Sequence, residues 1–183
     1  MPWEACGTPR AKEARRTLAE DSSVKGRLPA GIVDTGFASL ATFIVGLTAV
    51  VRFDDLDRGA YALFFSAFVM GSLIANEWIF TPAEVEAVSF PEPKRLSLLP
   101  RSLTLGTGPC LFGATASFVA LAFALSYAAV AVTVGLAVTS AVLIVVSTMQ
   151  SHVRRMLHIA AHSTTAAGMS VAQFIVVATG VWI

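Results

Sequence analysis

Three polar residues of this sequence, Asp34, Asn76 and Glu77, could carry out chemistry because they lie inside apolar segments. Asp34 lies about one helical turn into the first apolar segment, and Asn76 and Glu77 lie about one turn before the end of the second. If both segments are antiparallel helices, the three side chains reach a similar depth. A carboxylate inside a membrane span is costly and suggests a functional site or a buried pair. We therefore predict a polar cavity in which Asp34 and Glu77 bind a coupling cation, exchange protons or position a substrate.

A second interpretation of these carboxylates stays open. Both could reach the lipid headgroup region and pair there with Arg95 or Arg101. Gln173, in the last apolar segment, is a further candidate for the cavity, although a hydrogen bond between two helices is the simpler explanation of its amide.

The polar segment 151–162 holds the paired arginines Arg154 and Arg155 together with histidines. His158 and His162 are one helical turn apart, but a metal site needs a third ligand, and no carboxylate or cysteine is close in the sequence. No metal site is predicted. The segment mixes apolar and basic residues as interfacial helices do, so we predict that Arg154 and Arg155 contact anionic lipid headgroups.

Motifs of known enzymes are missing from the sequence. Gly106 and Gly108 lack the strand–helix context of a dinucleotide-binding loop, and neither a phosphate-binding loop nor a nucleophile elbow occurs. The formal net charge of +1 gives no general attraction to nucleic acid. We predict no enzyme activity, no catalytic residue, no cofactor and no nucleic-acid partner.

The elements that must position these residues are long apolar segments. The chain has 183 residues, of which 55% are hydrophobic and 14% charged, and its mean hydropathy is +0.71. A helix of about 20 apolar residues spans a membrane, and five such spans are predicted, over 31–51, 60–80, 103–125, 128–147 and 166–183. Lipid offers the backbone no hydrogen-bond partner, and the alternating strands of a barrel do not occur. The expected fold is therefore an all-α, polytopic transmembrane helical bundle.

The segments between and before these spans complete the prediction. Residues 103–150 carry no charge and would reach about 72 Å as one helix, so the chain must turn back near Ser126 and Tyr127. The segment 81–101 contains four prolines and is predicted to be a solvent-facing loop. Residues 1–30 form a polar, basic tail that is predicted to be disordered, with a short surface helix over 10–20 as the alternative.

Small and hydroxyl residues recur at helical spacing in three of the spans, which places each set on one helix face. Such faces allow close helix packing or line a hydrated cavity, and both interpretations stay open. Pro109 is expected to kink or loosen the third span. The three sets are Thr35, Ser39, Thr42 and Gly46; Ala67, Gly71 and Ala75; and Gly106, Cys110, Gly113 and Ser117.

The distribution of lysines and arginines predicts the orientation. With a cytoplasmic N-terminus, eleven of the 13 basic residues lie on the inner side, and only Arg52 and Arg58 lie on the outer side. The outer connector also contains Asp54, Asp55 and Asp57. Because basic connectors stay in the cytoplasm, we predict that the N-terminus is inside. The predicted location is the cell inner membrane, as a multi-pass protein.

Two stretches are typical of one transporter family. GIVDTGFASLATFIVGLTAVVRFDDLDRGAYALFFSAF has a polar residue early in a helix rich in small residues, and a short outer loop that leads into Gly59, Ala60, Tyr61 and Ala62. STMQSHVRRMLHIAAHSTTAAGMSVAQFIVVATG has a basic connector with paired arginines before the next span. Both stretches resemble bacterial polysaccharide and lipid-linked oligosaccharide flippases, of the multidrug/oligosaccharidyl-lipid/polysaccharide exporter superfamily.

The resemblance implies transport by alternating access, with a lipid-linked sugar as substrate and membrane lipids as partners. That family has two helical bundles, whereas the spans predicted here fill less than one, and the loop FDDLDRG departs from the family's usual outer loop. We therefore expect a truncated or partial copy that works with a second bundle or with a copy of itself. The alternative function is a non-transporting structural or accessory membrane subunit.

Overall fold

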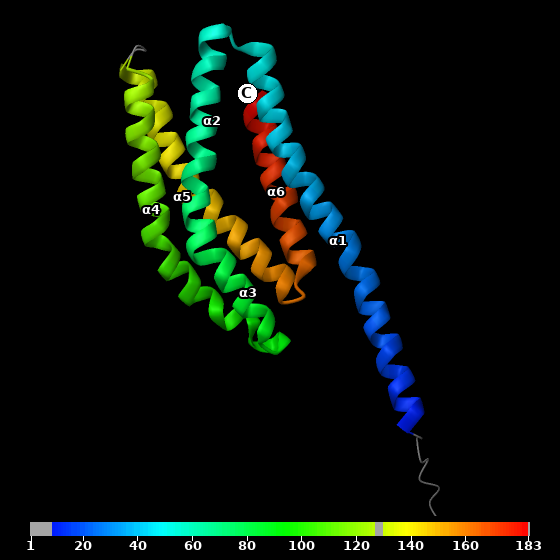
Figure 1. The fold of residues 1–183 in the computed structure, drawn as a ribbon. Helices are drawn as coiled ribbons and strands as arrows, with labels where there is room; N and C mark the ends of the chain where they lie inside the picture. The colour runs from blue at the N-terminus through cyan, green and yellow to red at the C-terminus, as the bar shows by residue number, and fades with distance from the viewer. Residues whose placement is uncertain (1–8, 127–129, 183) are drawn as a thin grey trace, which may run out of the picture.

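The chain folds into helices throughout the part that the computed structural model describes, which is residues 9–126 and 130–182, with side chains from residue 30 to residue 181 outside that gap. No strand occurs in these ranges, so the predicted all-α fold is confirmed. The α-helices are α1 (Pro9–Arg52), α2 (Asp55–Ala75), α3 (Thr81–Ser89), α4 (Leu99–Ala124), α5 (Val130–Ile159) and α6 (Ser163–Trp182) (Figure 1). A π-helix (Asn76–Phe80) joins α2 to α3, and a 3-10 helix (Glu92–Leu98) precedes α4.

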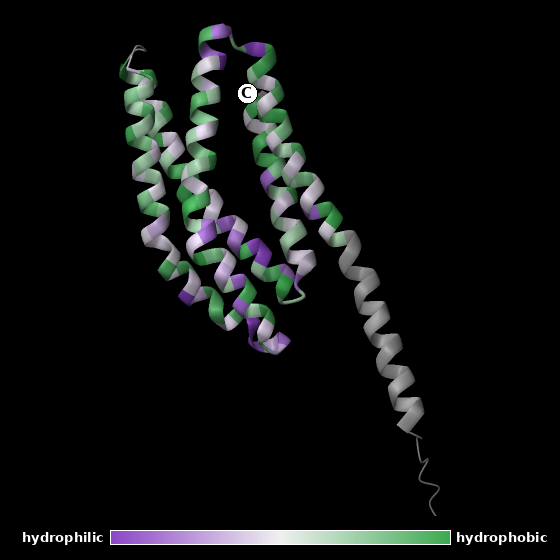
Figure 2. Cartoon of the chain, in the orientation of Figure 1, coloured by the Kyte–Doolittle hydropathy of each residue, from purple (hydrophilic) through white to green (hydrophobic). Residues whose placement is uncertain are grey.

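Five helical stretches of the described chain are long and apolar enough to cross a membrane. They are Ala30–Arg52, Asp55–Ser89, Glu92–Ala124, Val130–Ile159 and Ser163–Val181, and each contains one of the predicted spans or most of it. Figure 2 shows apolar residues along these helices, with the hydrophilic residues gathered near the turns and around the lower half of α5. The chain is therefore a multi-pass helical membrane protein.

The proline-rich segment is helical, so the prediction of a solvent-facing loop over 81–101 is wrong. Pro82 directly follows the π-helix, and the helical run nevertheless continues without a break from Asp55 to Ser89. The helix ends only where Phe90, before Pro91, takes an extended conformation. At the N-terminus, α1 begins at Pro9, so residues 9–30 are helical rather than disordered. The expectation for residues 1–8 falls outside the described residues.

Five of the six α-helices form two groups, and α3 packs on α5 and on the two short helices (Figure 1). α2, α4 and α5 pack on one another along much of their length, and we call them the three-helix group. α1 packs mainly on α6, with the rings of Phe37 and Phe174 in edge-to-face contact at 5.2 Å, and we call these two helices the α1/α6 pair. Contacts between the two groups are much fewer.

Glycines allow the close approach of helices inside the three-helix group. A Cβ atom at Gly71 of α2 would lie 2.9 Å from the carbonyl oxygen of Gly113 in α4, and one at Gly113 would overlap the backbone of Gly71. Similarly, Gly106 leaves room for the ring of Phe80. The predicted packing face of the third span, Gly106, Cys110, Gly113 and Ser117, is buried as expected for helix packing.

The helix-packing interpretation of the small-residue face in the first span is wrong. Thr35, Ser39 and Thr42 are exposed, and the buried face of α1 carries Asp34, Ala41 and Ala49 instead. The two faces lie about a quarter of a turn apart on the helix. An alanine side chain has no polar group that needs a hydrogen-bond partner, so it suits the contact with α6.

The bundle has two different ends (Figure 1). α3, the 3-10 helix and the α5–α6 connector lie at one end, which we call the α3 end. There Arg95 Nη1 donates a hydrogen bond of 2.8 Å to the carbonyl oxygen of Ile159, the last residue of α5. At the opposite end, Asp54 caps α2 by accepting a hydrogen bond of 2.9 Å from the backbone N–H of Asp57. The predicted orientation places the α3 end in the cytoplasm.

Candidate functional site

A buried carboxylate, Asp34, joins the two helix groups. Ser170 of α6 donates a hydrogen bond to Asp34 Oδ1, and His158 Nε2 of α5 lies 2.8 Å from Asp34 Oδ2. Arg154 Nε of α5 lies 3.5 Å from Oδ1, while its Nη1 donates to Ser170 Oγ at 2.9 Å. We call Asp34, Arg154, His158 and Ser170 the Asp34 cluster. It satisfies a carboxylate that is only 6% exposed, as a buried charge requires.

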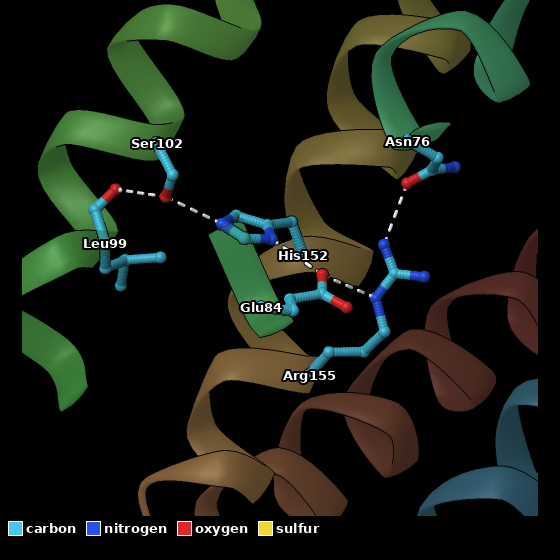
Figure 3. Close-up of polar contacts among 6 residues, drawn as sticks. All are labelled: Asn76, Glu84, Leu99, Ser102, His152 and Arg155. Atoms are coloured by element: carbon cyan, nitrogen blue, oxygen red, sulfur yellow. Dashed lines mark hydrogen bonds and ion pairs between the residues drawn. The ribbon is translucent and has the colours of Figure 1, made fainter. Parts of the chain in front are cut away.

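A second cluster holds α3 and α4 against α5 (Figure 3). His152 of α5 is fully buried and lies between two oxygen atoms: Nδ1 is 2.8 Å from Glu84 Oε1 of α3, and Nε2 is 2.7 Å from Ser102 Oγ of α4. Ser102 Oγ also lies 3.0 Å from the carbonyl oxygen of Leu99. The imidazole stacks on the ring of Phe80, with centroids 4.3 Å apart.

Arg155 completes this second cluster. Its Nε lies 2.9 Å from the same Glu84 Oε1 atom that faces His152, as an ion pair. Its Nη2 donates a hydrogen bond of 2.8 Å to Asn76 Oδ1 in the π-helix. We call Asn76, Glu84, Ser102, His152 and Arg155 the Glu84 cluster. π-Helical turns occur frequently at functional sites, and here the turn carries both Asn76 and Phe80 to α5.

A cleft of about 440 Å³ lies between the α1/α6 pair and the helices α2 and α5. Aromatic residues of α2 form one wall, and small residues of α1 form another. Polar side chains of α5 and α6 line the part nearest the α3 end, where Gln150 Nε2 donates a hydrogen bond of 3.2 Å to Gln173 Oε1. The lining includes Ala38, Ala41 and Thr42 of α1; Tyr61, Phe64, Phe65 and Phe68 of α2; Gln150 and Arg154 of α5; and Gln173 of α6.

The structure brings together only some of the residues predicted from the sequence. Asp34 does not meet Glu77, which is exposed in the π-helix and has no ion pair among the described residues. Asp34 also pairs with Arg154 rather than with Arg95 or Arg101. Asn76 reaches Arg155, in a different cluster.

Three further predicted residues have partners inside the protein. The hydrogen bond expected for Gln173 is confirmed by its contact with Gln150. Arg154 and Arg155 were predicted to face lipid headgroups, but their guanidinium groups are engaged by Asp34 and Glu84 respectively. The description of 151–162 as an interfacial turn is wrong for His152, which is fully buried.

Sequence reasoning missed Glu84, Ser102, His152 and Ser170. A signal for His152 was present, because the buried residues of α5 recur at helical spacing up to it: Thr133, Ala137, Ser140, Ile144, Thr148, His152 and Met156. No comparable signal marks Glu84 or Ser102, since both lie in the proline-rich segment or just after it.

Comparison of this chain with protein-family models, with characterised proteins and with solved structures finds no match. The class of protein is therefore defined by the fold alone, as a multi-pass helical membrane protein, and functional arguments depend on its clusters and its cleft.

Proposed function

We propose that the chain is a membrane transporter that resembles a polysaccharide or lipid-linked oligosaccharide flippase and works by alternating access. The feature that supports this proposal most directly is the cleft between the two helix groups. Its volume of about 440 Å³ falls within the range of about 300–1,000 Å³ that is usual for small-molecule sites.

The lining of the cleft suits an amphipathic ligand. Phe64, Phe65 and Phe68 provide an apolar wall for a hydrocarbon chain, whereas Gln150, Gln173 and Arg154 provide polar contacts at one end. Amides bind sugar hydroxyls, and a guanidinium binds phosphate. A lipid-linked sugar, which combines all three chemical parts, fits this distribution.

Arg154 connects the cleft to the contact that joins the two helix groups. Its side chain lines the cleft, and its guanidinium also lies 3.5 Å from Asp34 and 2.9 Å from Ser170. A phosphate that enters the cleft would compete with Asp34 for this guanidinium. Ligand binding would then weaken the Asp34 cluster and let the α1/α6 pair move relative to α5, as alternating access requires.

Complementation tests the proposal. The full chain is expressed in a strain that lacks its own flippase for a cell-surface polysaccharide, and export is measured together with the amount of inserted protein. Wild-type chain is expected to restore export, and Asp34→Ala is expected to abolish it without loss of insertion. Asp57→Ala, which removes an exposed carboxylate at the opposite end of the bundle, is the matched control and should export normally.

Glu77→Ala separates two versions of the proposal. If Glu77 belongs to the cavity, as predicted from the sequence, this variant loses export. If transport uses the cleft, export changes little, because Glu77 is exposed and is not among the residues that line the cleft. Normal export by Asp34→Ala would remove the Asp34 cluster from the mechanism. A wild-type chain that inserts but restores no export would contradict transport by this chain alone and favour an accessory role.

A further inference from the structure

His152 is held in a way that can accommodate one additional proton. We propose that the Glu84 cluster is a proton-binding site, in which His152 gains and loses a proton that enters from the α3 end, with the hydroxyl of Ser102 turning to match. The existence of this site depends only on the contacts of His152. A role of this proton in driving transport rests on the transport function proposed above.

Two complete hydrogen-bonding arrangements exist around the imidazole. In the neutral form, Nδ1–H donates to Glu84 Oε1 at 2.8 Å, and Nε2 accepts from the hydroxyl of Ser102 at 2.7 Å. In the protonated form, Nε2–H donates to Ser102 Oγ, and the hydroxyl proton of Ser102 turns to the carbonyl oxygen of Leu99, 3.0 Å away. Both ring nitrogens keep a partner in either form, so neither form leaves an unpaired buried group.

The charged groups that face His152 are one carboxylate and one guanidinium. Glu84 comes from α3, Ser102 from α4 and the uncharged ring of Phe80 from the π-helix, while Arg155 of α5 meets the same Glu84 oxygen. With neutral His152, the ion pair of Glu84 and Arg155 leaves the cluster without net charge. With protonated His152 the cluster carries one positive charge, and imidazolium and guanidinium share one carboxylate oxygen.

A proton can reach this site from the α3 end. A pocket of about 190 Å³ lies beside the cluster, and Ser102 forms part of its wall together with Trp78, Glu86 and Arg101. Most of the lining is apolar, but Glu86 and Arg101 place two exposed charged side chains in the same wall. The hydroxyl of Ser102 therefore stands between the pocket and Nε2 of His152, which is otherwise fully buried. A hydroxyl in this position can donate its own proton to Nε2 and accept another from the pocket side.

The row of Ser102, His152 and Glu84 also has the order of nucleophile, base and acid in serine hydrolases. Two features favour proton binding over nucleophilic attack. Ser102 is only 3% exposed. It also lies within the regular helix α4, which directly follows the 3-10 helix, and the backbone N–H of Leu99 at this junction already donates to the carbonyl oxygen of Leu96.

Nitrogen NMR of the full chain tests the proposal. Histidine is labelled with ¹⁵N, the chain is placed in lipid nanodiscs, and spectra are recorded from about pH 5 to pH 8, where imidazoles titrate. His158→Gln and His162→Gln identify the other two histidines, so the remaining signals belong to His152. The expected result is an Nδ1–H tautomer in the neutral form, because Glu84 accepts from Nδ1, and protonation of both nitrogens as the pH falls.

Substitutions at Ser102 extend this test. Ser102→Ala is expected to lower the protonated fraction of His152 severalfold at a fixed pH, because both forms lose the partner of Nε2 and an unpaired N–H on the charged ring costs more than an unpaired nitrogen on the neutral ring. Ser102→Thr, which keeps the hydroxyl, should restore the fraction. Thr104→Ala removes a hydroxyl that bonds only to the Pro100 carbonyl in the same helix and should change nothing.

Several results would overturn the proton site. These are an Nε2–H tautomer in the wild-type chain, one protonation state throughout the pH range, an unchanged protonated fraction in Ser102→Ala, or covalent labelling of Ser102 by a fluorophosphonate probe. Because the spectra require no transport, a chain that exports nothing but shows the expected titration would contradict only the proposed transport function.

Discussion

The Glu84 cluster and the Asp34 cluster are built from the same types of side chain but lie in very different surroundings. Each contains one carboxylate, one histidine, one arginine and one serine. α5 supplies the histidine and the arginine in both cases, with 152 and 155 facing one way and 154 and 158 facing another, as helical periodicity requires.

The difference lies in what surrounds each cluster. The Glu84 cluster joins α3 and the π-helix to α4 and α5 of the three-helix group, where the ring of Phe80 covers His152 and glycines bring α2 and α4 together. The Asp34 cluster joins helix groups that otherwise touch little, beside a cleft. The same types of side chain therefore stabilise a tightly packed region in the Glu84 cluster, whereas in the Asp34 cluster they form a contact between two helix groups that can separate.

The largest effect is expected where the three-helix group is most tightly packed. Gly113→Ala places a methyl group against the backbone of Gly71, which cannot rotate away, so α2 and α4 must separate. We expect a loss of about 3 kcal/mol in the free energy of unfolding. The measurement is thermal unfolding in detergent, followed by the reaction of a thiol-specific dye with the buried Cys110 in a Cys6→Ser background.

Gly108→Ala is the matched control for that experiment. It adds the same methyl group to the same helix, but at a position where nothing lies within 4 Å of the new atom. Its stability should equal or exceed that of the wild type. If Gly113→Ala and Gly108→Ala lowered the free energy of unfolding equally, the close approach of α2 and α4 at Gly113 would not be what makes this position sensitive.

Removal of Glu84 should destabilise the three-helix group less strongly. Glu84→Ala leaves His152 without its Nδ1 partner and leaves Arg155 without its carboxylate. Arg155 retains access to water, which reduces the loss to about 2 kcal/mol. Glu86→Ala, which removes an exposed carboxylate from the same helix, should be neutral in the same thermal assay. Similar losses in both variants would contradict a special role for the Glu84 cluster.

Removal of Asp34 should act on the contact between the groups rather than on the whole fold. In Asp34→Ala, we expect amide hydrogen exchange of α6 to rise about tenfold, because local opening no longer breaks a buried charge pair. Exchange in α4 should stay at the wild-type rate. An equal rise in α4 and α6 would mean that the bundle unfolds as one unit, and the comparison of two helix groups would fail.

The smallest effect is expected inside the α4–α5 contact. Ser117 and Ser140 are buried and share a hydrogen bond of 2.7 Å. Ser117→Ala should lower the free energy of unfolding by about 1 kcal/mol, because it leaves the hydroxyl of Ser140 unpaired. The double variant Ser117→Ala, Ser140→Ala should lose less than the sum of the two single losses in the same thermal assay. Additive losses would contradict the shared bond.

The spans could be predicted from the sequence because a helix that crosses lipid needs a long apolar run, and such runs are visible without knowledge of packing. The buried face of α4 was also visible, since Gly106, Cys110 and Gly113 recur at helical spacing and all are buried. The proline-rich segment was misjudged because a proline through which a helix continues, such as Pro82, looks the same in sequence as a proline that ends a helix.

The partners of the charged residues could not be predicted in the same way. Apolar periodicity shows which face of a helix is buried but not which helix it meets, so Asp34 was expected near Glu77 although its partners come from α5 and α6. Arg154 and Arg155 look alike in sequence, yet Arg154 faces the α1/α6 pair and Arg155 faces α3 and the π-helix, because adjacent residues of a helix point in different directions.

The distance between the two helix groups tests the central claim most directly. Spin labels at Val176 of α6 and Phe123 of α4, both exposed, report this distance by double electron–electron resonance in nanodiscs. The wild-type chain should give one narrow distribution, and Asp34→Ala should add a population at longer distance. An unchanged distribution in Asp34→Ala would contradict the claim that the Asp34 cluster holds two separable groups together.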